Sequence, residues 1–329
     1  MTKAQVIFEQ GPPEVMHWQD WPVPPPSANE VRIRHTAIGV NFADTYHRAG
    51  ISHPWPVPPR PCVVGFEAAG VVEAVGRECS TFKAGDRVCY GIPPLGSYSE
   101  VRNYPADQLL HTPNDIPDEQ IAALLMKGMT AQYLLRRTYP VQPGEFVLVH
   151  AASGGMGLIL CQWARALGAT VIGTVSTEEK AKLAAEAGCH YPIVRSKEDF
   201  LKRSREITSG EGVAVVYESI GKDTLQKSLD CLRPMGVCAA YGHASGAPDP
   251  VDIIKDLGAR GSLFITRPAI MHYVAKRADL EASSNELFSA IRARIVKADI
   301  KYRYPLKDAG EAHRAIGSGT TAGAAILLP

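Results

Sequence analysis

A short glycine-rich stretch constrains the fold of this chain more than any other feature. The apolar run Val147-Leu148-Val149 is followed by Gly154, Gly155 and Gly157, and a further apolar stretch begins at once after them. An apolar strand that passes through glycines into a helix is typical of a turn that binds a dinucleotide pyrophosphate. Glycine lets the backbone approach the phosphates, and the helix N-terminus offers free N–H groups. The spacing is Ala-x-x-Gly-Gly-x-Gly rather than G-x-G-x-x-G, so the flanking strand and helix carry much of this prediction.

The end of the next apolar strand indicates which dinucleotide the chain prefers. An acidic residue there would bond the ribose 2′-hydroxyl of NAD(H) and repel a 2′-phosphate. This chain runs from Gly173 to Ser176 without an acid, and Lys180 and Arg195 follow. A hydroxyl and two cations suit a phosphate, so the sequence predicts NADPH as the cofactor.

The second part of the chain alternates apolar strands with helical stretches. Strands are predicted at 146–149, 170–175, 213–217, 237–241 and 262–265, and helices at 121–139, 158–167 and 178–187, with another through Ser228. This alternation predicts a doubly wound parallel sheet. Two further helices are predicted at 269–276 and 285–297, and a last apolar run at 324–328 is expected to return to the first domain.

The first part of the chain has a different pattern. Sixteen of the 25 prolines lie in the first 117 residues, between short strand-like runs at 5–8, 31–38, 68–75, 86–90 and 98–103. Short strands separated by glycine and proline turns predict an antiparallel, barrel-like β domain. We therefore divide the chain into residues 1–125 (substrate domain), 126–266 (nucleotide-binding domain) and 267–329 (a segment that returns to the first domain).

The composition excludes several classes of function. The 329 residues are 45% hydrophobic and 21% charged, with a net charge of +1. This balance is that of a globular protein and gives no electrostatic support for nucleic-acid or membrane binding. The seven cysteines include no CxxC pair, so we expect free, mostly buried thiols. The N-terminus lacks the pattern of a signal peptide, and we expect a cytoplasmic protein.

Further motifs are similar to those of a known family. They are Gly39-Val40-Asn41-Phe42-Ala43-Asp44 with Tyr46, Gly65-Phe66-Glu67-Ala68-Ala69-Gly70, Phe82-Lys83-Ala84-Gly85-Asp86, the 151–157 turn and Thr266-Arg267-Pro268. With these motifs the whole chain resembles the zinc-free, zeta-crystallin-like NADPH:quinone oxidoreductases of the medium-chain dehydrogenase/reductase superfamily. The resemblance implies an α/β fold with a GroES-like β-barrel-type domain, a Rossmann domain, and the cofactor in the cleft between them.

The resemblance also implies the residues that would bind NADPH. They are Asn41 and Thr130 at the nicotinamide half, Phe264 and Thr266 near the carboxamide, Gly154, Gly155, Met156 and Gly157 at the pyrophosphate, and Gly173, Ser176, Lys180 and Arg195 around the adenosine phosphate. Tyr46 and Asn41 would flank the substrate and are the candidate catalytic residues. Tyr241 follows a strand at the edge where ligands collect in such sheets, as does His243, so we include Tyr241 among the candidate contacts.

The sequence predicts no metal site. Zinc-containing relatives have a cysteine near the position of Asn41 and a Gly-His-Glu where this chain has Gly65-Phe66-Glu67, and a phenylalanine cannot bind zinc. The other candidate ligands are scattered: Cys62, His47 and His53. Glu67 is expected to form local hydrogen bonds. Quinone reduction does not require a Lewis acid, because it yields a resonance-stabilised phenolate.

Several of these residues also have a structural explanation. Tyr46 could bond or stack on a quinone, or serve as an ordinary packed tyrosine. Asn41 could contact a ligand or cap the helix that follows it. His150 is expected to be buried rather than catalytic. The basic residues Lys197, Lys202, Arg203 and Arg205 are expected to form a solvated helix face.

Three functions stay open at this point. The first is an NADPH-dependent quinone reductase, and the second is a reductase of enone or enoyl double bonds. The third is a non-catalytic role as an NADPH sensor, structural protein or RNA-binding protein. A homodimer is expected, with 262–266 as a candidate edge strand for pairing.

Overall fold

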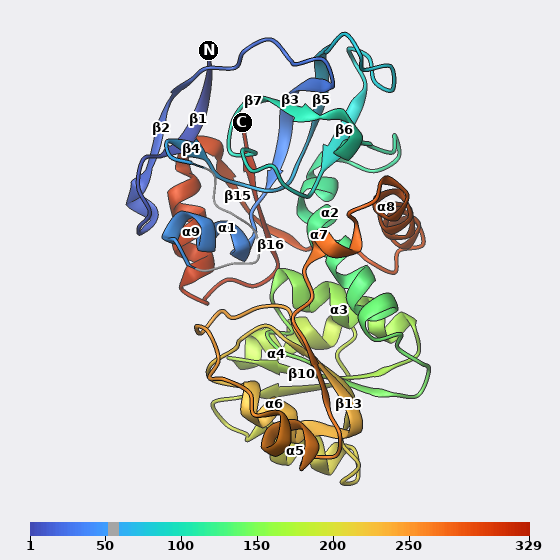
Figure 1. Ribbon diagram of the computed structural model, residues 1–329. Coiled ribbons are helices and arrows are strands. Elements are labelled where there is room, and N and C mark those ends of the chain that lie inside the picture. Colours follow the sequence, from blue (N-terminus) through green and yellow to red (C-terminus); the bar gives the residue numbers. More distant parts are fainter. Residues whose placement is uncertain (52–58) are drawn as a thin grey trace. The chain divides into compact units, whose positions relative to one another are not determined.

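The computed structural model describes residues 1–51 and 59–329, so His53 lies outside the described residues. The chain divides into two compact units (Figure 1). Unit 1 comprises Met1–Met129, Val274–Phe288 and Lys297–Pro329. Unit 2 comprises Thr130–Tyr273 and Ser289–Val296.

Unit 1 is built on antiparallel β-structure. Its elements are β1 (Thr2–Ile7), β2 (Met16–Trp21), β3 (Glu30–Gly39), α1 (Phe42–Ala49), β4 (Cys62–Val63), β5 (Ala68–Val75), β6 (Arg87–Tyr90), β7 (Val101–Pro105), β8 (Leu110–His111), most of α2 (Asp118–Tyr133) and of α8 (Arg277–Arg292), β15 (Ile300–Pro305), α9 (Ala309–Gly317) and β16 (Ala324–Leu328). The larger sheet has the order β15-β16-β3-β5-β6-β8, with β7 paired to β3, and the smaller has the order β2-β1-β4. Strand β16 pairs with β3, so the last apolar run does return to the first part of the chain, as predicted.

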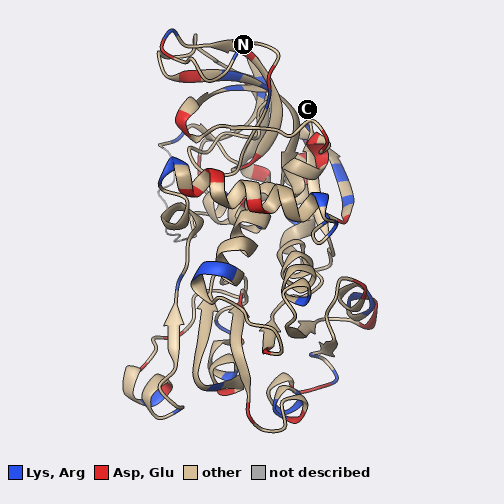
Figure 2. Ribbon diagram, turned by 90° about the vertical axis from the view of Figure 1, so that its right-hand side faces the viewer, with Lys and Arg blue, Asp and Glu red and all other residues tan. Residues whose placement is uncertain are grey.

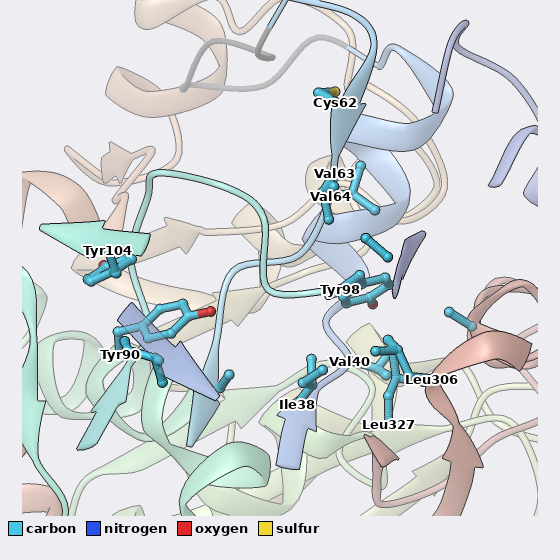
Figure 3. Close-up of a cluster of buried hydrophobic side chains, with 14 of the residues drawn as sticks. Ile38, Val40, Cys62, Val63, Val64, Tyr90, Tyr98, Tyr104, Leu306 and Leu327 are labelled. Atoms are coloured by element: carbon cyan, nitrogen blue, oxygen red, sulfur yellow. The ribbon is translucent and has the colours of Figure 1, made fainter. Parts of the chain in front are cut away.

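The core of unit 1 is made by the inward-facing residues of these strands. Figure 3 shows part of this cluster, including Ile38 and Leu327 from the larger sheet and Val40, which follows β3. The rings of Tyr90 and Tyr104 stack with their centroids 4.1 Å apart. Helices α1 and α9 cover one side of this unit and are joined there by buried polar contacts described below.

Unit 2 is a parallel sheet with the order β11-β10-β9-β12-β13-β14. Its elements are β9 (Phe146–Val149), α3 (Gly155–Ala166), β10 (Thr170–Val175), α4 (Glu178–Glu186), β11 (Tyr191–Val194), α5 (Phe200–Ile207), β12 (Val213–Glu218), α6 (Leu225–Cys231), β13 (Leu232–Ala240), β14 (Phe264–Thr266) and α7 (Ile270–Tyr273), with π-helical turns at Leu134–Thr138 and Ile253–Gly258. Figure 1 shows α3 and α4 on one side of β10 and α5 and α6 on the other. Every residue of β12 is buried, as expected for a sheet covered on both faces.

Some sequence-based boundaries were wrong. A helix was predicted at 285–297, but α8 runs from Arg277 to Arg292. Its first turns contain an Arg277–Glu281 ion pair and the buried residues Ser283 and Ser284. Because these residues are polar, the sequence shows no clear apolar period over the first half of the helix. Strands β2 and β15 and helix α9 were not predicted. Helix α9 buries the small Ala309 and Ala312, which give only a weak periodic signal.

The basic residues near α5 mix with acidic ones. Lys and Arg are interspersed with Asp and Glu along the ribbon (Figure 2). Lys197 pairs with Glu178 at 2.6 Å, and Arg203 pairs with Glu206 at 3.1 Å, which supports the predicted solvated face. Arg205 is the exception, because its guanidinium donates to backbone carbonyls of residues 210, 230 and 232 and so ties α5 to its neighbours.

Candidate functional site

The glycine-rich turn joins β9 to α3 and leaves the helix N-terminus without a side-chain cap. Gly154 is the N-cap residue, and the first turn of α3 contains no acidic residue. Ala151 adopts a left-handed conformation with φ of 50°, and its carbonyl accepts the Gly154 N–H at 2.9 Å. Gly154, Gly155 and Met156 are partly exposed. The first turn therefore leaves backbone N–H groups uncapped by side chains, as the predicted pyrophosphate contact requires.

Two glycines allow this turn to pack closely on the sheet. A Cβ on Gly157 would lie 2.2 Å from the carbonyl oxygen of Ala151, so α3 could not approach the turn with any other residue there. A Cβ on Gly173 in β10 would lie 2.6 Å from Cys189 Sγ and 2.7 Å from Ala152 Cβ. At Gly157 that space is filled by the backbone of the turn, and at Gly173 it is filled by the side chains of Cys189 and Ala152. Both glycines thus allow the close packing that a dinucleotide turn requires.

Ser176 and Arg195 lie at neighbouring strand ends. Val175 of β10 pairs with Val194 of β11, and the Arg195 N–H donates to the Val175 carbonyl at 3.0 Å. Ser176 and Arg195 therefore come directly after paired positions, and both are exposed. Lys180 lies in the first turn of α4, where burial lowers the pKa of its partly buried ammonium. The structure thus places all three predicted phosphate ligands at one edge of the sheet.

Four other candidates lie in unit 2. The Thr130 hydroxyl, near the end of α2, hydrogen-bonds Tyr133, whose ring stacks on that of Tyr273 at 4.1 Å. Tyr241 follows β13 directly, and Thr266 ends β14, so both lie at the carboxyl edge of the sheet. Phe264 begins β14 and is 60% exposed.

A buried polar network lies beneath the turn. His150 is fully buried, as predicted, between Thr174 Oγ1 and Ser228 Oγ at 2.9 Å each, and 3.4 Å from Glu218 Oε2. Glu218 also accepts from the N–H groups of Ile220 and Gly221. Burial opposes the ionisation of Glu218, but His150 and these donors lower its pKa overall.

Glu218 was not predicted as a site residue. Its carboxylate also accepts from two hydroxyl groups, those of Thr224 at 2.9 Å and Ser228 at 2.5 Å. The available signal was a single acid at the end of an otherwise apolar strand. The network fixes the turn between β12 and α6 and supports the strand that leads into the glycine turn.

In unit 1, Asn41 and Tyr46 lie on or beside α1. Asn41 is the N-cap residue of α1, and its backbone N–H donates to Asp44 Oδ2 at 2.8 Å. Its side-chain Nδ2 donates to Glu67 Oε1 at 2.9 Å. Tyr46 is largely buried, with its ring edge against Phe42 at 5.3 Å between centroids.

Glu67 is held by three donors. Beside Asn41, the backbone N–H of Met126 donates to Oε2 at 2.7 Å, and the Lys127 ammonium donates to Oε1 at 2.9 Å. The predicted local hydrogen-bonding role of Glu67 is therefore confirmed. Lys127 was not predicted as a site residue, although a lysine within an apolar helical stretch indicates a buried partner of opposite charge.

The residues at this position do not fit zinc. Both Glu67 oxygens are engaged, one of them by an ammonium group that would repel a cation. Phe66 is buried, offers no ligand atom, and packs against the His47 ring at 4.9 Å. Among residues 1–51 and 59–329, no group of three or more His, Cys, Asp or Glu is placed to hold a metal ion.

A second buried network joins α1 to α9. Tyr98 donates to Asp44 Oδ2 at 2.9 Å and lies 2.9 Å from His313 Nε2. Arg48 lies 3.0 Å from His313 Nδ1, and a guanidinium only donates, so neutral His313 carries its proton on Nε2. Burial lowers the pKa of His313 to about 3 and raises that of Asp44 to about 7.

The cysteines are free thiols. Six are buried and Cys79 is partly exposed, and burial raises the pKa of Cys89 and Cys231 to about 12. These cysteines act as small apolar residues, as predicted.

Comparison with known proteins identifies the family. Residues 27–117 match the model "Alcohol dehydrogenase GroES-like domain", and residues 155–278 match "Zinc-binding dehydrogenase". The chain is 55% identical to a 2-haloacrylate reductase of a Burkholderia species, over 100% of this chain and 99% of that one. It is 45% identical to quinone oxidoreductase 1 of Escherichia coli, over 98% of both chains. The chain belongs to the quinone oxidoreductase family of the medium-chain dehydrogenase/reductase superfamily.

Solved structures of this family agree with the fold. The crystal structure of Escherichia coli quinone oxidoreductase complexed with NADPH has a TM-score of 0.96 to this chain, at 44% identity and with 100% of both chains covered. The structure of 2-haloacrylate reductase has a TM-score of 0.88 at 54% identity, with 99% of both chains covered. The predicted combination of a GroES-like domain with a Rossmann-type sheet is thus confirmed. No helix among the described residues is long and apolar enough to cross a membrane.

Proposed function

We propose that this member of the quinone oxidoreductase family catalyses the NADPH-dependent reduction of quinones without a metal ion, in the cytoplasm. The glycine turn carries the proposal, because its uncapped helix N-terminus and the close packing that Gly157 and Gly173 allow suit a dinucleotide pyrophosphate. Relatives named quinone oxidoreductase match 98% or more of the chain at 45% identity, and a crystal structure of a quinone oxidoreductase contains NADPH.

The residues of unit 2 would bind the cofactor. Gly155, Met156 and Gly157 supply backbone N–H groups to the pyrophosphate, and Gly154, whose own N–H donates to the Ala151 carbonyl, lets the backbone approach it. Ser176, Lys180 and Arg195 bind the phosphate on the adenosine ribose, and Gly173 lets the strand that leads to Ser176 pack against Ala152 and Cys189. Thr130, Tyr241, Phe264 and Thr266 contact the nicotinamide half.

The residues of unit 1 would act on the substrate. NADPH, when bound, supplies the hydride. Asn41 orients the nicotinamide half, and the Tyr46 hydroxyl donates a hydrogen bond to an oxygen of the acceptor, where negative charge develops as the hydride arrives. The protein thus contributes alignment and hydrogen bonding, and solvent supplies the final proton.

A second candidate is reduction of the carbon–carbon double bond of a 2-haloacrylate. The 55% identity to a 2-haloacrylate reductase favours this candidate. A quinone and a 2-haloacrylate both present an electron-poor double bond conjugated to a carbonyl or carboxylate group, so one hydride-transfer site could serve either. A purely non-catalytic role has no specific observation in its favour.

We also propose that the protein forms a homodimer through strand β14. This strand lies at the edge of the parallel sheet, and its exposed Phe264 lies in the same unit as exposed Ile253 and Ile254. An edge strand with exposed apolar side chains is a template for pairing with a second copy.

The substrate is tested by NADPH oxidation with purified protein. We expect turnover with 1,4-benzoquinone that is unchanged by a chelator, because Glu67 is already paired with Lys127. The same assay is run with 2-chloroacrylate and with a simple enone. Turnover of 2-chloroacrylate at least tenfold faster than of the quinone would assign the second candidate. No turnover of any acceptor, despite NADPH binding, would contradict both.

The cofactor preference is tested by removing the two cations. In K180A/R195A, we expect the Kd for NADPH to rise about 30-fold, roughly 2 kcal/mol, because two charge-assisted contacts to the phosphate are lost. The Kd for NADH should change less than twofold. K182A is the matched control, since Lys182 is exposed on the same helix, α4. If the Kd values for NADPH and NADH rise by the same factor, Lys180 and Arg195 do not bind the 2′-phosphate.

A further inference from the structure

Lys127 is a buried cation, and the proposed function assigns it no role. Its side chain is 9% exposed and its partner Glu67 is 0% exposed, with 2.9 Å between Nζ and Oε1. Removing two charges from water costs several kcal/mol, and apolar residues of similar volume often stabilise a fold as well or better. Stability alone therefore does not account for this pair.

The pair decides how the Asn41 side chain is oriented. An ionised carboxylate only accepts hydrogen bonds, so the end of the Asn41 amide that faces Glu67 must be Nδ2. The amide oxygen Oδ1 then lies at the other end, toward the first turn of α1, where Asn41 and Asp44 form a capping box. The Lys127 ammonium keeps Glu67 an acceptor by donating to the same oxygen, Oε1.

The pocket leaves Glu67 little room to turn. A Cβ on Gly39 would lie 2.3 Å from Glu67 Oε1 and 2.1 Å from the Ala122 carbonyl oxygen, so only glycine fits there. The Gly39 N–H donates to the Glu67 carbonyl at 3.1 Å, and the Met126 N–H holds Oε2. Four elements thus meet at one carboxylate: β3, the segment before β5, α2 and the start of α1.

We propose that Lys127 is a positioning residue. By holding Glu67 as an ionised acceptor, Lys127 fixes the direction of the Asn41 amide, and with it the pattern of donor and acceptor that Asn41 presents to the nicotinamide half of the cofactor. This inference rests on the proposed function, in which Asn41 contacts that half.

The direct test exchanges the charged pair for a neutral one. In E67Q/K127M no charge is left unpaired. The Met126 N–H takes the glutamine oxygen, so the glutamine NH₂ faces Asn41 and turns its amide around. We expect the Kd for NADPH to rise at least tenfold. Adenosine 2′,5′-bisphosphate, which lacks the nicotinamide half, should bind with unchanged Kd.

Adenosine 2′,5′-bisphosphate separates positioning from folding. A merely structural role for the Glu67–Lys127 pair would change the melting temperature of E67Q/K127M, but it would not alter NADPH binding relative to the bisphosphate.

Single variants keep the test decisive if the double variant does not fold. K127R retains the cation and should bind NADPH like wild type, whereas K127Q should bind it three- to tenfold more weakly. Equal NADPH binding by K127Q and wild type, or by E67Q/K127M and wild type, would overturn the inference. Failure of wild type to bind either NADPH or the bisphosphate would instead overturn the proposed function.

Discussion

Replacing Gly157 with alanine is expected to weaken NADPH binding at least 100-fold, or about 3 kcal/mol. The new Cβ would lie 2.2 Å from the Ala151 carbonyl oxygen and 2.6 Å from Ala152 Cα, and neither backbone atom can move without moving the turn. Helix α3 must shift away from the turn, and its first N–H groups move with it. We also expect a loss of about 1–3 kcal/mol in the free energy of unfolding, as for other overpacked sites.

Calorimetric titration with NADPH and urea unfolding of the free protein measure these two effects. G317A is the matched control, because Gly317 ends a helix of unit 1 and a Cβ added there would meet no atom within 4 Å. This control should bind NADPH like wild type. A G157A protein that binds NADPH within threefold of wild type would show that the turn does not cradle the cofactor.

Replacing Glu218 with alanine is expected to lower the free energy of unfolding by about 3–5 kcal/mol. The carboxylate is fully buried and accepts from the Ile220 and Gly221 N–H groups and from the Thr224 and Ser228 hydroxyls. Alanine would leave these donors unsatisfied inside unit 2. E218Q keeps one acceptor oxygen, so its free energy of unfolding should fall less than that of E218A.

Urea unfolding at two pH values checks the role of the charge. The pKa of Glu218 is lowered from its ordinary value of 4.5, so its stabilising contribution is present above that pH and is lost as the pH falls further. The difference between wild type and E218A should therefore narrow below about pH 4. E198A removes an exposed acid of the same unit and should change the stability by less than about 0.5 kcal/mol. If E218A lowers the free energy of unfolding as little as E198A does, the buried Glu218 network does not stabilise unit 2 as proposed.

The features predicted well from the sequence depend on local physical chemistry. The strands at 68–75, 146–149 and 170–175 were placed at their observed bounds, because continuous apolar runs between turn residues are readable locally. The two helices that were misplaced or missed are those whose inward faces include small or polar residues. Helix α8 buries serines, and α9 buries alanines and His313, so neither shows a clear apolar period.

The position of the dinucleotide turn and the lack of an acid at the end of β10 could be read from the amino-acid sequence without a structure. Both depend on residues next to one another in the chain, where only glycine allows the backbone approach. Which charged and polar groups meet became visible only in the folded chain. Glu67 contacts Lys127, 60 residues away, and His150 contacts Ser228, 78 residues away. Such pairs form only when distant elements pack together, because burial then forces each polar group to find a partner that no local pattern specifies.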